Sequence, residues 1–244
     1  MDALAECLDH DGLVVLPEIF APLEVVEMIT SLDQVFAHAN AVVLRSTQAI
    51  FGARNLLQLW PATATVWRKP RLIDFVTQVL GMSAGLVRGL YFDKPPEQSW
   101  TLPFHRDKTI AVRDNRALGP EFRNPTTKAG VPHVEAPNQI LERMLTLRIH
   151  LDPMTLENEP LSLIPGSHRS ERPTAETVMP LGSAGDVLAM RPLVVHGSRD
   201  AMPGTKLRRR IVHLEFAAMR ELPDRMEWHE FIPVRESCSS ISEE

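Results

Sequence analysis

The chain has 244 residues, of which 44% are hydrophobic and 23% are charged, and its formal net charge is −5 at pH 7. This composition is that of an ordinary soluble globular protein, and the lack of a basic excess argues against nucleic acid as the main partner. Chains of about 200–250 residues often form one β-rich domain, and this length allows a dry interior site without disulfides. No uncharged apolar run reaches the roughly 20 residues of a spanning helix, so no membrane partner is predicted.

The two ends of the chain bear on its location. The two cysteines, Cys7 and Cys238, lie near opposite ends and lack the spacing of a metal or redox motif. Isolated thiols fit a reducing compartment. The first residues have no positively charged region followed by an apolar core, so no signal peptide is predicted. These features favour a cytoplasmic location.

The first half of the chain is predicted to mix helices and strands. Apolar residues recur at three- and four-residue steps after Pro22, which predicts a helix that packs one face on a sheet. Gly81 is suited to end another helix. The elements predicted in this half are a strand over 12–17, helices over 22–36, 62–67 and 70–80, and a strand over 86–92.

The second half is predicted to be almost all β. A polar stretch over 111–138 shows little regular pattern, and a loop of that length in a compact domain is usually functional, so we expect an active-site lid. Helices followed by many short strands predict an α+β, mainly β fold that closes into a barrel or sandwich. We expect one domain over 1–235 and a polar, disordered tail over 236–244. The strands predicted in this half are 144–151, 161–164, 186–190, 193–196 and 209–216.

The stretch with the clearest chemistry ends in His105-Arg106-Asp107. In a strand, residues two positions apart point to the same face, so His105 and Asp107 can converge while Arg106 faces away. Two histidines and one carboxylate form the facial triad that binds Fe(II) and leaves positions open. His196, at the end of an apolar strand and before a glycine, is the candidate third ligand. The competing interpretations are a surface loop for His105 and Asp107 and a backbone-bonded core histidine for His196.

Three adjacent arginines, Arg208, Arg209 and Arg210, open the last long strand. Alternation turns at least one of them inward, and a buried guanidinium needs an anionic partner, which a ligand carboxylate can supply. Arg148 raises the same question because it lies in the middle of a strand. A solvated strand end is the simpler interpretation of such a run.

Four segments in order resemble the phytanoyl-CoA dioxygenase family. They are His105-Arg106-Asp107, residues 147–152 leading to 158–168, residues 192–198, and residues 209–216, and the resemblance extends over about residues 10–218. It implies a double-stranded β-helix (a jelly-roll or cupin-like barrel) flanked by N-terminal helices. It also implies an Fe(II)- and 2-oxoglutarate-dependent dioxygenase that uses O2 to hydroxylate a C–H bond and releases succinate and CO2, with ascorbate as a reductant.

Carried over residue by residue, the resemblance makes His105, Asp107 and His196 the iron ligands. It makes Arg209 the partner of the distal carboxylate of 2-oxoglutarate, with Ser198 beside it and Arg148 near the cosubstrate. Relatives usually have glutamine in place of Arg106 and glycine in place of Glu159. Arg106 is therefore expected to add positive charge beside the metal and to favour an acidic substrate. Because relatives that halogenate have a small residue at the carboxylate position, Asp107 favours hydroxylation.

Other functions stay open from the sequence. A zinc hydrolase could use the same ligand set, although no base stands near the motif and Arg209 would have no role. A non-catalytic barrel could bind a small carboxylate, whereas a purely structural domain leaves the ordered motifs unexplained. The substrate is expected to be a small molecule, and cations of the 111–138 stretch favour an anionic one, although a solvated basic loop explains them equally well. These cations are Arg113, Arg116, Arg123 and Lys128.

Overall fold

The computed structural model describes residues 2–38, 43–46, 49–96, 100–170 and 176–235, with the backbone alone for 43–46 and 49–50. Its helices are α1 (Asp2–Asp11), α2 (Pro22–His38), α3 (Leu56–Leu59), α4 (Pro70–Leu80) and α5 (Asn138–Leu141). The strands of the first half are β1 (Leu13–Leu16), β2 (Val43–Ser46), β3 (Ala49–Ala53), β4 (Gly85–Lys94), β5 (Leu102–His105) and β6 (Thr109–Ala111). Those of the second half are β7 (Arg123–Lys128), β8 (Val131–Glu135), β9 (Met144–His150), β10 (Ser162–Leu163), β11 (Val187–Met190), β12 (His196–Ser198), β13 (Arg209–Ala217) and β14 (Ile232–Pro233).

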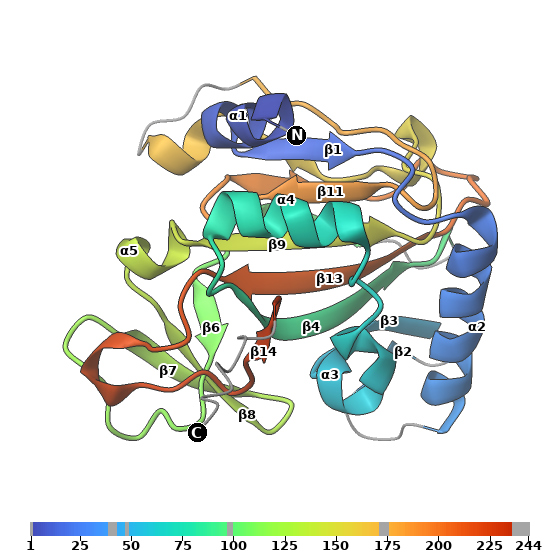
Figure 1. Ribbon diagram of the computed structural model, residues 1–244. Coiled ribbons are helices and arrows are strands. Elements are labelled where there is room, and N and C mark those ends of the chain that lie inside the picture. The colour runs from blue at the N-terminus through green and yellow to red at the C-terminus, as the bar shows by residue number, and fades with distance from the viewer. Residues whose placement is uncertain (1, 39–42, 47–48, 97–99, 171–175, 236–244) are drawn as a thin grey trace, which may run out of the picture.

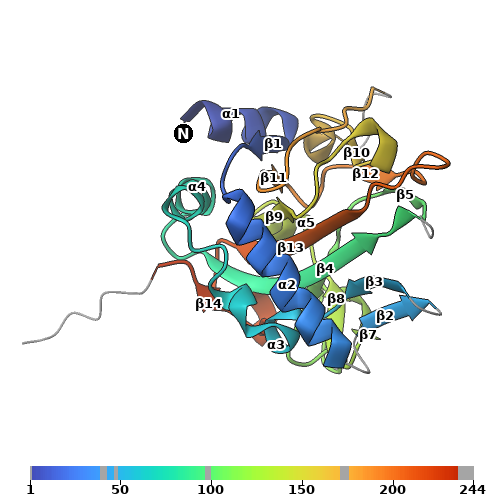
Figure 2. The ribbon, with the colours of Figure 1, turned by 90° about the vertical axis from the view of Figure 1, so that its right-hand side faces the viewer.

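An eight-stranded antiparallel sheet forms the centre of the molecule, in the order β1-β11-β9-β13-β4-β3-β2 with β14 beside β4 (Figure 1). Two three-stranded sheets, β10-β12-β5 and β6-β8-β7, complete the β structure. Figure 2 shows α2 and α4 on one side of the large sheet and β10, β12 and β5 on the other. The large sheet therefore has one face toward helices and one toward the small sheets.

Alternation along the central strands places apolar side chains on the face of the sheet toward the helices and buried polar side chains on the opposite face. On β13, Val212, Leu214 and Phe216 belong to the apolar cluster shared with α2 and α4. The intervening Arg209, His213 and Glu215 are also buried, but they face away from the helices because successive side chains of a strand point to opposite faces. On β9, Leu145, Leu147 and Ile149 pack in the same cluster, whereas Arg148 and His150 alternate with them. The face of the sheet opposite the helices is thus lined with charged groups.

The helical layer follows from its sequence. Helix α4 begins with proline at its first position and ends at Gly81, whose φ of 89° suits a residue without a side chain. Its apolar face buries Leu72, Phe75 and Val76. Trp67, before this helix, is fully buried and packs edge-on against Phe216, with ring centroids 5.1 Å apart. This layer holds the large sheet in place, so the polar residues on its other face are rigidly positioned.

The predicted fold class is confirmed, with sheets that stay separate instead of forming one closed ladder. The helix over 70–80 is confirmed, but the helical region placed at 62–67 begins earlier, with α3 and a 3₁₀ turn at Pro61–Ala64. The strand predicted at 193–196 has the wrong boundaries. Val194 N–H donates to the carbonyl of Arg191 in a turn, and β12 starts at His196. The predicted tail over 236–244 and Cys238 lie outside the described residues.

The prediction of an irregular loop over 111–138 is wrong for residues 123–135. Strands β7 and β8 form a hairpin that pairs with β6. Nearly every residue of β7 is exposed, so the strand has no alternating apolar pattern that could have revealed it. A role of this hairpin as a lid stays a prediction. Among the described residues, no helix combines the length and the apolar character needed to cross a membrane.

Candidate functional site

Two histidines face each other across a strand pair. His105 ends β5 and His196 begins β12, and they are directly paired in the antiparallel register of these strands. Their ring centroids lie 4.4 Å apart. Asp107 lies between them, with Oδ1 3.4 Å from His105 Nε2 and Oδ2 3.6 Å from His196 Nε2. One ligand atom from each of the three residues lies within 4.8 Å of the others, so the set is compact enough to hold a metal ion.

The placement of Asp107 has a different cause from the one predicted. Strand β5 ends at His105, so Asp107 is not part of it. Its backbone N–H donates to the carbonyl of Pro192 at 3.0 Å, which attaches the residue to the turn before β12. The convergence of the three side chains therefore depends on this link between two distant segments and on the pairing of β5 with β12.

Both imidazoles are oriented by the backbone. Nδ1 of His105 lies 2.8 Å from the carbonyl of Pro103, and Nδ1 of His196 lies 2.9 Å from the carbonyl of Val194. A carbonyl accepts only, so the proton of each neutral ring resides on Nδ1 and the lone pair of Nε2 faces Asp107. Such a carbonyl partner is typical of metal-binding histidines, because it fixes the tautomer and the ring orientation.

The electrostatics of the cluster favour a deprotonated donor set. Burial lowers the pKa of His196 to about 4, so this ring is neutral at physiological pH. Burial works to raise the pKa of Asp107, but the nearby imidazoles of His105, His196 and His213, when protonated, hold it well below its usual value. The carboxylate in turn raises the pKa of His105. A cation placed here meets one full negative charge and one imidazole already neutral.

Arg106 does not add charge beside the cluster, contrary to the expectation drawn from the sequence. Its Nε donates to the carbonyl of Leu193 at 2.9 Å, and its Nη2 donates to those of Ser167 at 2.9 Å and Ser170 at 2.7 Å. The guanidinium thus points away from the cluster and joins three backbone segments.

We expect Arg106→Met to lower the free energy of unfolding by about 1–3 kcal/mol, because it leaves partly buried carbonyls without a donor. Urea denaturation of the two proteins measures the change. Arg113→Met is the matched control: its partner Glu227 is exposed, so its loss should cost about 0–1 kcal/mol. Equal stability of the Arg106 and Arg113 variants would show that the three hydrogen bonds contribute nothing.

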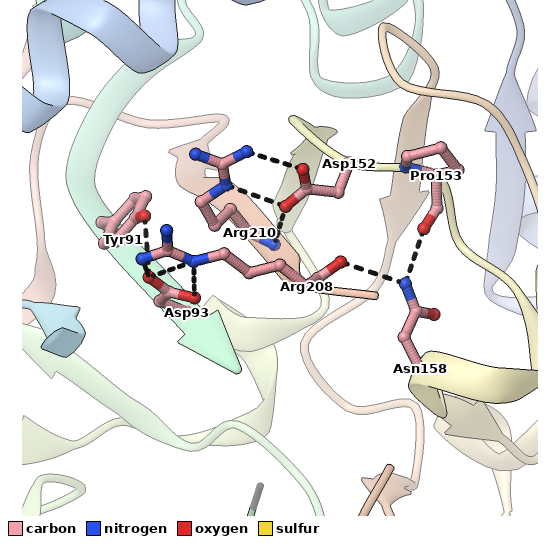
Figure 3. A network of polar contacts seen from close by, with 7 residues as sticks. All are labelled: Tyr91, Asp93, Asp152, Pro153, Asn158, Arg208 and Arg210. Carbon is pink, nitrogen blue, oxygen red and sulfur yellow. Dashed lines mark hydrogen bonds and ion pairs between the residues drawn. The ribbon is translucent and has the colours of Figure 1, made fainter. Parts of the chain in front are cut away.

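The three arginines of β13 are separated by their partners. Arg208 forms an ion pair with the fully buried Asp93, and Arg210 forms one with Asp152, with Nη2 to Oδ1 at 2.7 Å (Figure 3). The side-chain amide of Asn158 donates to the carbonyl of Arg208 at 3.2 Å. Arg209, between them, is 7% exposed and has no ion pair with any described residue. The outer arginines are held by carboxylates, and the middle one is left facing the interior.

Arg209 lies in a small cavity of about 40 Å³. Ser198, Arg148 and Lys94 line the same cavity, together with apolar side chains and with Asp93, whose carboxylate is paired with Arg208. Lys94 is opposite Arg209 in the pairing of β4 with β13, and its ammonium donates to Ser198 Oγ at 3.2 Å. Burial lowers the pKa of Arg209 to about 10 and that of Arg148 to about 9. Burial and the charge of Arg209 lower the pKa of Lys94 to about 7. The cavity concentrates positive charge and suits an anion.

A larger cavity of about 670 Å³ lies beside the small one and shares lining residues with it. His105, Asp107 and His196 line it, and Arg148 and Trp100 line both it and the smaller cavity. Its wall also carries residues that the sequence did not single out: Arg54, Arg88, Phe92, Trp100, His213 and Glu215. Arg88 Nη1 lies 3.2 Å from Glu215 Oε1, so these two charges satisfy each other. The volume is typical of sites for small organic molecules.

Arg113, Arg116, Arg123 and Lys128 were the candidates for binding an anionic substrate, and one of these four lines this cavity. Lys128 lines it, and its ammonium donates to Thr109 Oγ1 at 3.1 Å. Arg113 and Arg116 form exposed ion pairs with Glu227 and Asp114. Arg123 is exposed at the far end of β7 and lines a separate surface depression. Lys94 was missed because Asp93-Lys94-Pro95-Pro96 has the composition of a strand end.

The antiparallel sheets with a His-Asp-His cluster between them define a jelly-roll protein with a candidate metal centre. Residues 8–209 match the family model for phytanoyl-CoA dioxygenase (PhyH), which covers most of the chain. The chain therefore belongs to the phytanoyl-CoA dioxygenase family. No curated protein sequence matches it.

Solved structures share the fold at low sequence identity. The α-ketoglutarate-dependent epimerase SnoN from nogalamycin biosynthesis superposes with a TM-score of 0.67 and 18% identity, over 96% of this chain and 98% of SnoN. EctD from S. alaskensis with bound Fe gives a TM-score of 0.69 and 20% identity, over 96% of this chain and 87% of EctD. HygX from Streptomyces hygroscopicus with nickel and 2-oxoglutarate bound gives a TM-score of 0.63 and 17% identity, over 89% of this chain and 87% of HygX. All three confirm the jelly-roll fold.

Proposed function

We propose that this protein is an Fe(II)- and 2-oxoglutarate-dependent oxygenase that hydroxylates a C–H bond of a small organic substrate. The observation that carries the proposal is the convergence of His105, Asp107 and His196 on the wall of a cavity that borders buried cations with no ion pair to any described residue. Family membership supports the same class. The neighbours EctD and HygX, solved with Fe and with nickel and 2-oxoglutarate, support this cofactor pair.

The donor set fits Fe(II). Two histidines and one carboxylate on one side of a cavity are the facial set of non-haem Fe(II) oxygenases, and they leave the cavity side for other ligands. His105 Nε2, His196 Nε2 and one oxygen of Asp107 would hold the metal. The metal and 2-oxoglutarate, when bound, supply the oxidative chemistry by which O2 is activated with release of succinate and CO2.

The protein's own contribution is to bind, orient and exclude water. Arg209 would bind the distal carboxylate of 2-oxoglutarate, with Ser198 as a hydrogen-bonding neighbour and Lys94 as a second cation. Arg148, whose Nη1 lies 3.2 Å from His213 Nδ1, lines both cavities and lies on the path between the carboxylate site and the metal site. Because these groups are buried, each charge interaction is stronger than it would be in water.

Hydroxylation is the proposed outcome because Asp107 supplies a carboxylate ligand, as hydroxylating relatives do. The fold also supports other oxidative outcomes, since SnoN is an epimerase and SnoK a carbocyclase. A zinc hydrolase fits less well, because Glu215, the other carboxylate of the large cavity, is engaged by Arg88 and is not free to act as a base. A barrel that only binds a small carboxylate would show the binding described next without turnover.

The test is calorimetric titration of 2-oxoglutarate into the protein with and without Mn(II), followed by succinate formation with Fe(II), ascorbate and O2. We expect metal-dependent binding and at least slow succinate release. Tight binding that does not depend on metal would contradict the proposed centre. Metal-dependent binding without succinate, for every substrate tried, would favour the non-catalytic alternative.

The same titration is expected to depend on pH through Lys94. A bound dicarboxylate favours the protonated ammonium, so affinity should be highest below pH 7 and should fall, by up to about tenfold per pH unit, as the free protein loses this proton. Arg209 also lowers this pKa, whereas Asp200 and Glu159 raise it. Lys94→Met should bind more weakly and with a flat profile between pH 7 and 8, below the pKa of about 9 of Arg148, while Lys108→Met, an exposed control, should keep the slope. An unchanged slope in Lys94→Met would exclude Lys94 from the site.

A further inference from the structure

One wall of the large cavity carries cations that no acidic side chain neutralises. Arg54 and Lys128 both line the cavity and are half-buried. Among the residues that the structure describes, Arg54 makes no hydrogen bond or ion pair, and Lys128 donates only to the neutral hydroxyl of Thr109. Arg88, next to them, already has Glu215 as its partner. We call Arg54 and Lys128 the cationic wall.

The cationic wall is held together by a specific contact between two distant segments. The side-chain amide of Asn55 donates to the carbonyl of Ala129 at 2.9 Å, and these residues directly follow Arg54 and Lys128. Both adopt positive φ values, 58° for Asn55 and 50° for Ala129, so each segment turns sharply just after its cation. On β7 the residues before Lys128 are all exposed, and Lys128 alone turns into the protein.

Bringing these two charges together has an electrostatic cost. Burial and the charge of Arg88 lower the pKa of Arg54. Burial, Arg88 and Arg54 lower that of Lys128, and the smaller opposite effects of Glu215 and Asp107 do not cancel this. Like charges in a partly buried wall repel each other, and an anionic ligand removes that repulsion. The wall is therefore prepared for an anion that the protein itself does not provide.

Part of the large cavity is apolar. Phe51, Leu90, Phe92, Trp100 and Leu102 are among the residues that line it. An apolar surface beside a few convergent charges is the usual construction of a site for an amphiphilic small molecule. The distal carboxylate of the cosubstrate has its own cations in the small cavity, Arg209 and Lys94, which do not line the large one.

We propose that Arg54 and Lys128 bind the anionic head group, carboxylate or phosphate, of a substrate whose apolar body lies along the aromatic lining and reaches the His105–Asp107–His196 cluster. The role of that ligand as substrate rests on the proposed function, whereas the anion site itself does not. The head group fixes the orientation of the molecule, so the position that reacts is set by its distance from the charge.

The experiment uses three probes of similar shape: 3-phenylpropionate, 2-phenylethyl phosphate and the neutral 3-phenylpropionamide. Each is titrated calorimetrically into the full chain saturated with Mn(II) and N-oxalylglycine, which occupy the metal and cosubstrate sites. We expect the anions to bind at least about tenfold more tightly than the amide, and Arg54→Met and Lys128→Met each to lose about tenfold or more of that affinity, as expected for a hydrogen bond to a charged group. Tighter phosphate binding would assign a dianionic head group, and tighter carboxylate binding a monoanionic one.

Arg123→Met is the matched control, because it removes the same charge from the exposed end of the same strand and should leave anion binding unchanged. Lys128→Arg keeps the charge and should keep most of the affinity, which separates the anion contact from a folding defect. The proposal is overturned if the anions bind no better than the amide, if neither methionine variant weakens them, or if Arg123→Met weakens them equally. It is also overturned if Arg54→Met weakens N-oxalylglycine instead, since Arg54 then belongs to the cosubstrate site.

A separate titration distinguishes failure of this inference from failure of the proposed function. The anions and the amide are also titrated into metal-free protein. If Mn(II) and N-oxalylglycine do not bind at all, the proposed function fails, but a difference between anion and amide that depends on Arg54 and Lys128 still supports the anion site. If they bind and that difference is missing, the anion site alone is wrong.

Discussion

Asp107→Ala is expected to abolish metal-dependent turnover of 2-oxoglutarate, reducing succinate formation by at least about a thousandfold. Loss of an outer partner of a metal ligand costs about 10–100-fold, and the loss of the only carboxylate of the donor set must cost more. The carboxylate also contacts both imidazoles, at 3.4 and 3.6 Å, so its removal leaves their Nε2 atoms without an anionic neighbour. His105→Ala should have an effect of the same order.

Two measurements make this prediction decisive. Fe(II) or Mn(II) affinity is measured beside succinate formation, because turnover without the true substrate can be slow in the unaltered protein. Asp114→Ala is the matched control: it removes an exposed carboxylate whose partner is the exposed Arg116, and it should leave both quantities unchanged. Succinate formation that survives in both Asp107→Ala and His105→Ala would show that the metal is bound elsewhere.

Arg209→Met is expected to weaken metal-dependent binding of 2-oxoglutarate by about 30-fold or more. Removing one member of a buried charge pair costs at least about 2 kcal/mol, much of it because the other charge stays buried and unpaired. Arg209 is 7% exposed and has no ion pair with described residues, so a ligand carboxylate there would depend on it strongly. The readout is the dissociation constant by calorimetry together with the KM for 2-oxoglutarate.

The neighbouring arginine provides the control for this second prediction. Arg210→Lys keeps a charge opposite Asp152 on the other face of β13, so it should change affinity by less than about threefold. Arg209→Lys keeps the charge but loses the bidentate geometry of the guanidinium. Its affinity for 2-oxoglutarate should therefore lie between those of Arg209→Met and the unaltered protein. If Arg209→Met binds as tightly as Arg210→Lys, the cosubstrate does not lie in the small cavity.

The sequence was informative wherever a local rule decides the outcome. Strand alternation was enough to predict that one of three adjacent arginines faces inward. Arg106 does face away from His105 and Asp107, but its own backbone partners place it there, because β5 ends at His105. Ordered motifs identified the candidate set that the structure brings together. In these cases the neighbours along the chain, or the resemblance to a family, carry the needed information.

The features that were missed depend on contacts between distant segments. Lys94 matters because it is paired with Arg209 across the sheet, and nothing near either residue in the sequence shows that pairing. Arg54 joins Lys128 through the contact of Asn55 with Ala129, which no periodicity predicts. The sequence predicts that Arg106 adds a charge to the site, whereas in the structure its guanidinium donates to three backbone carbonyls of other segments.

The ion pairs of Arg208 and Arg210, on either side of Arg209, also determine where insertions and deletions leave the position of Arg209 unchanged. Asp93 on β4 and Asp152 after β9 hold Arg208 and Arg210 from opposite neighbours, so β13 is aligned at its first residues and not by the segment that leads into it. Residues inserted or removed between β12 and Arg208 leave that alignment intact. A single residue inserted within β13 directly after Arg210 instead moves Val212 to the charged side of the sheet. Variation in this part of the molecule is therefore confined to the connection, and the strand itself is fixed.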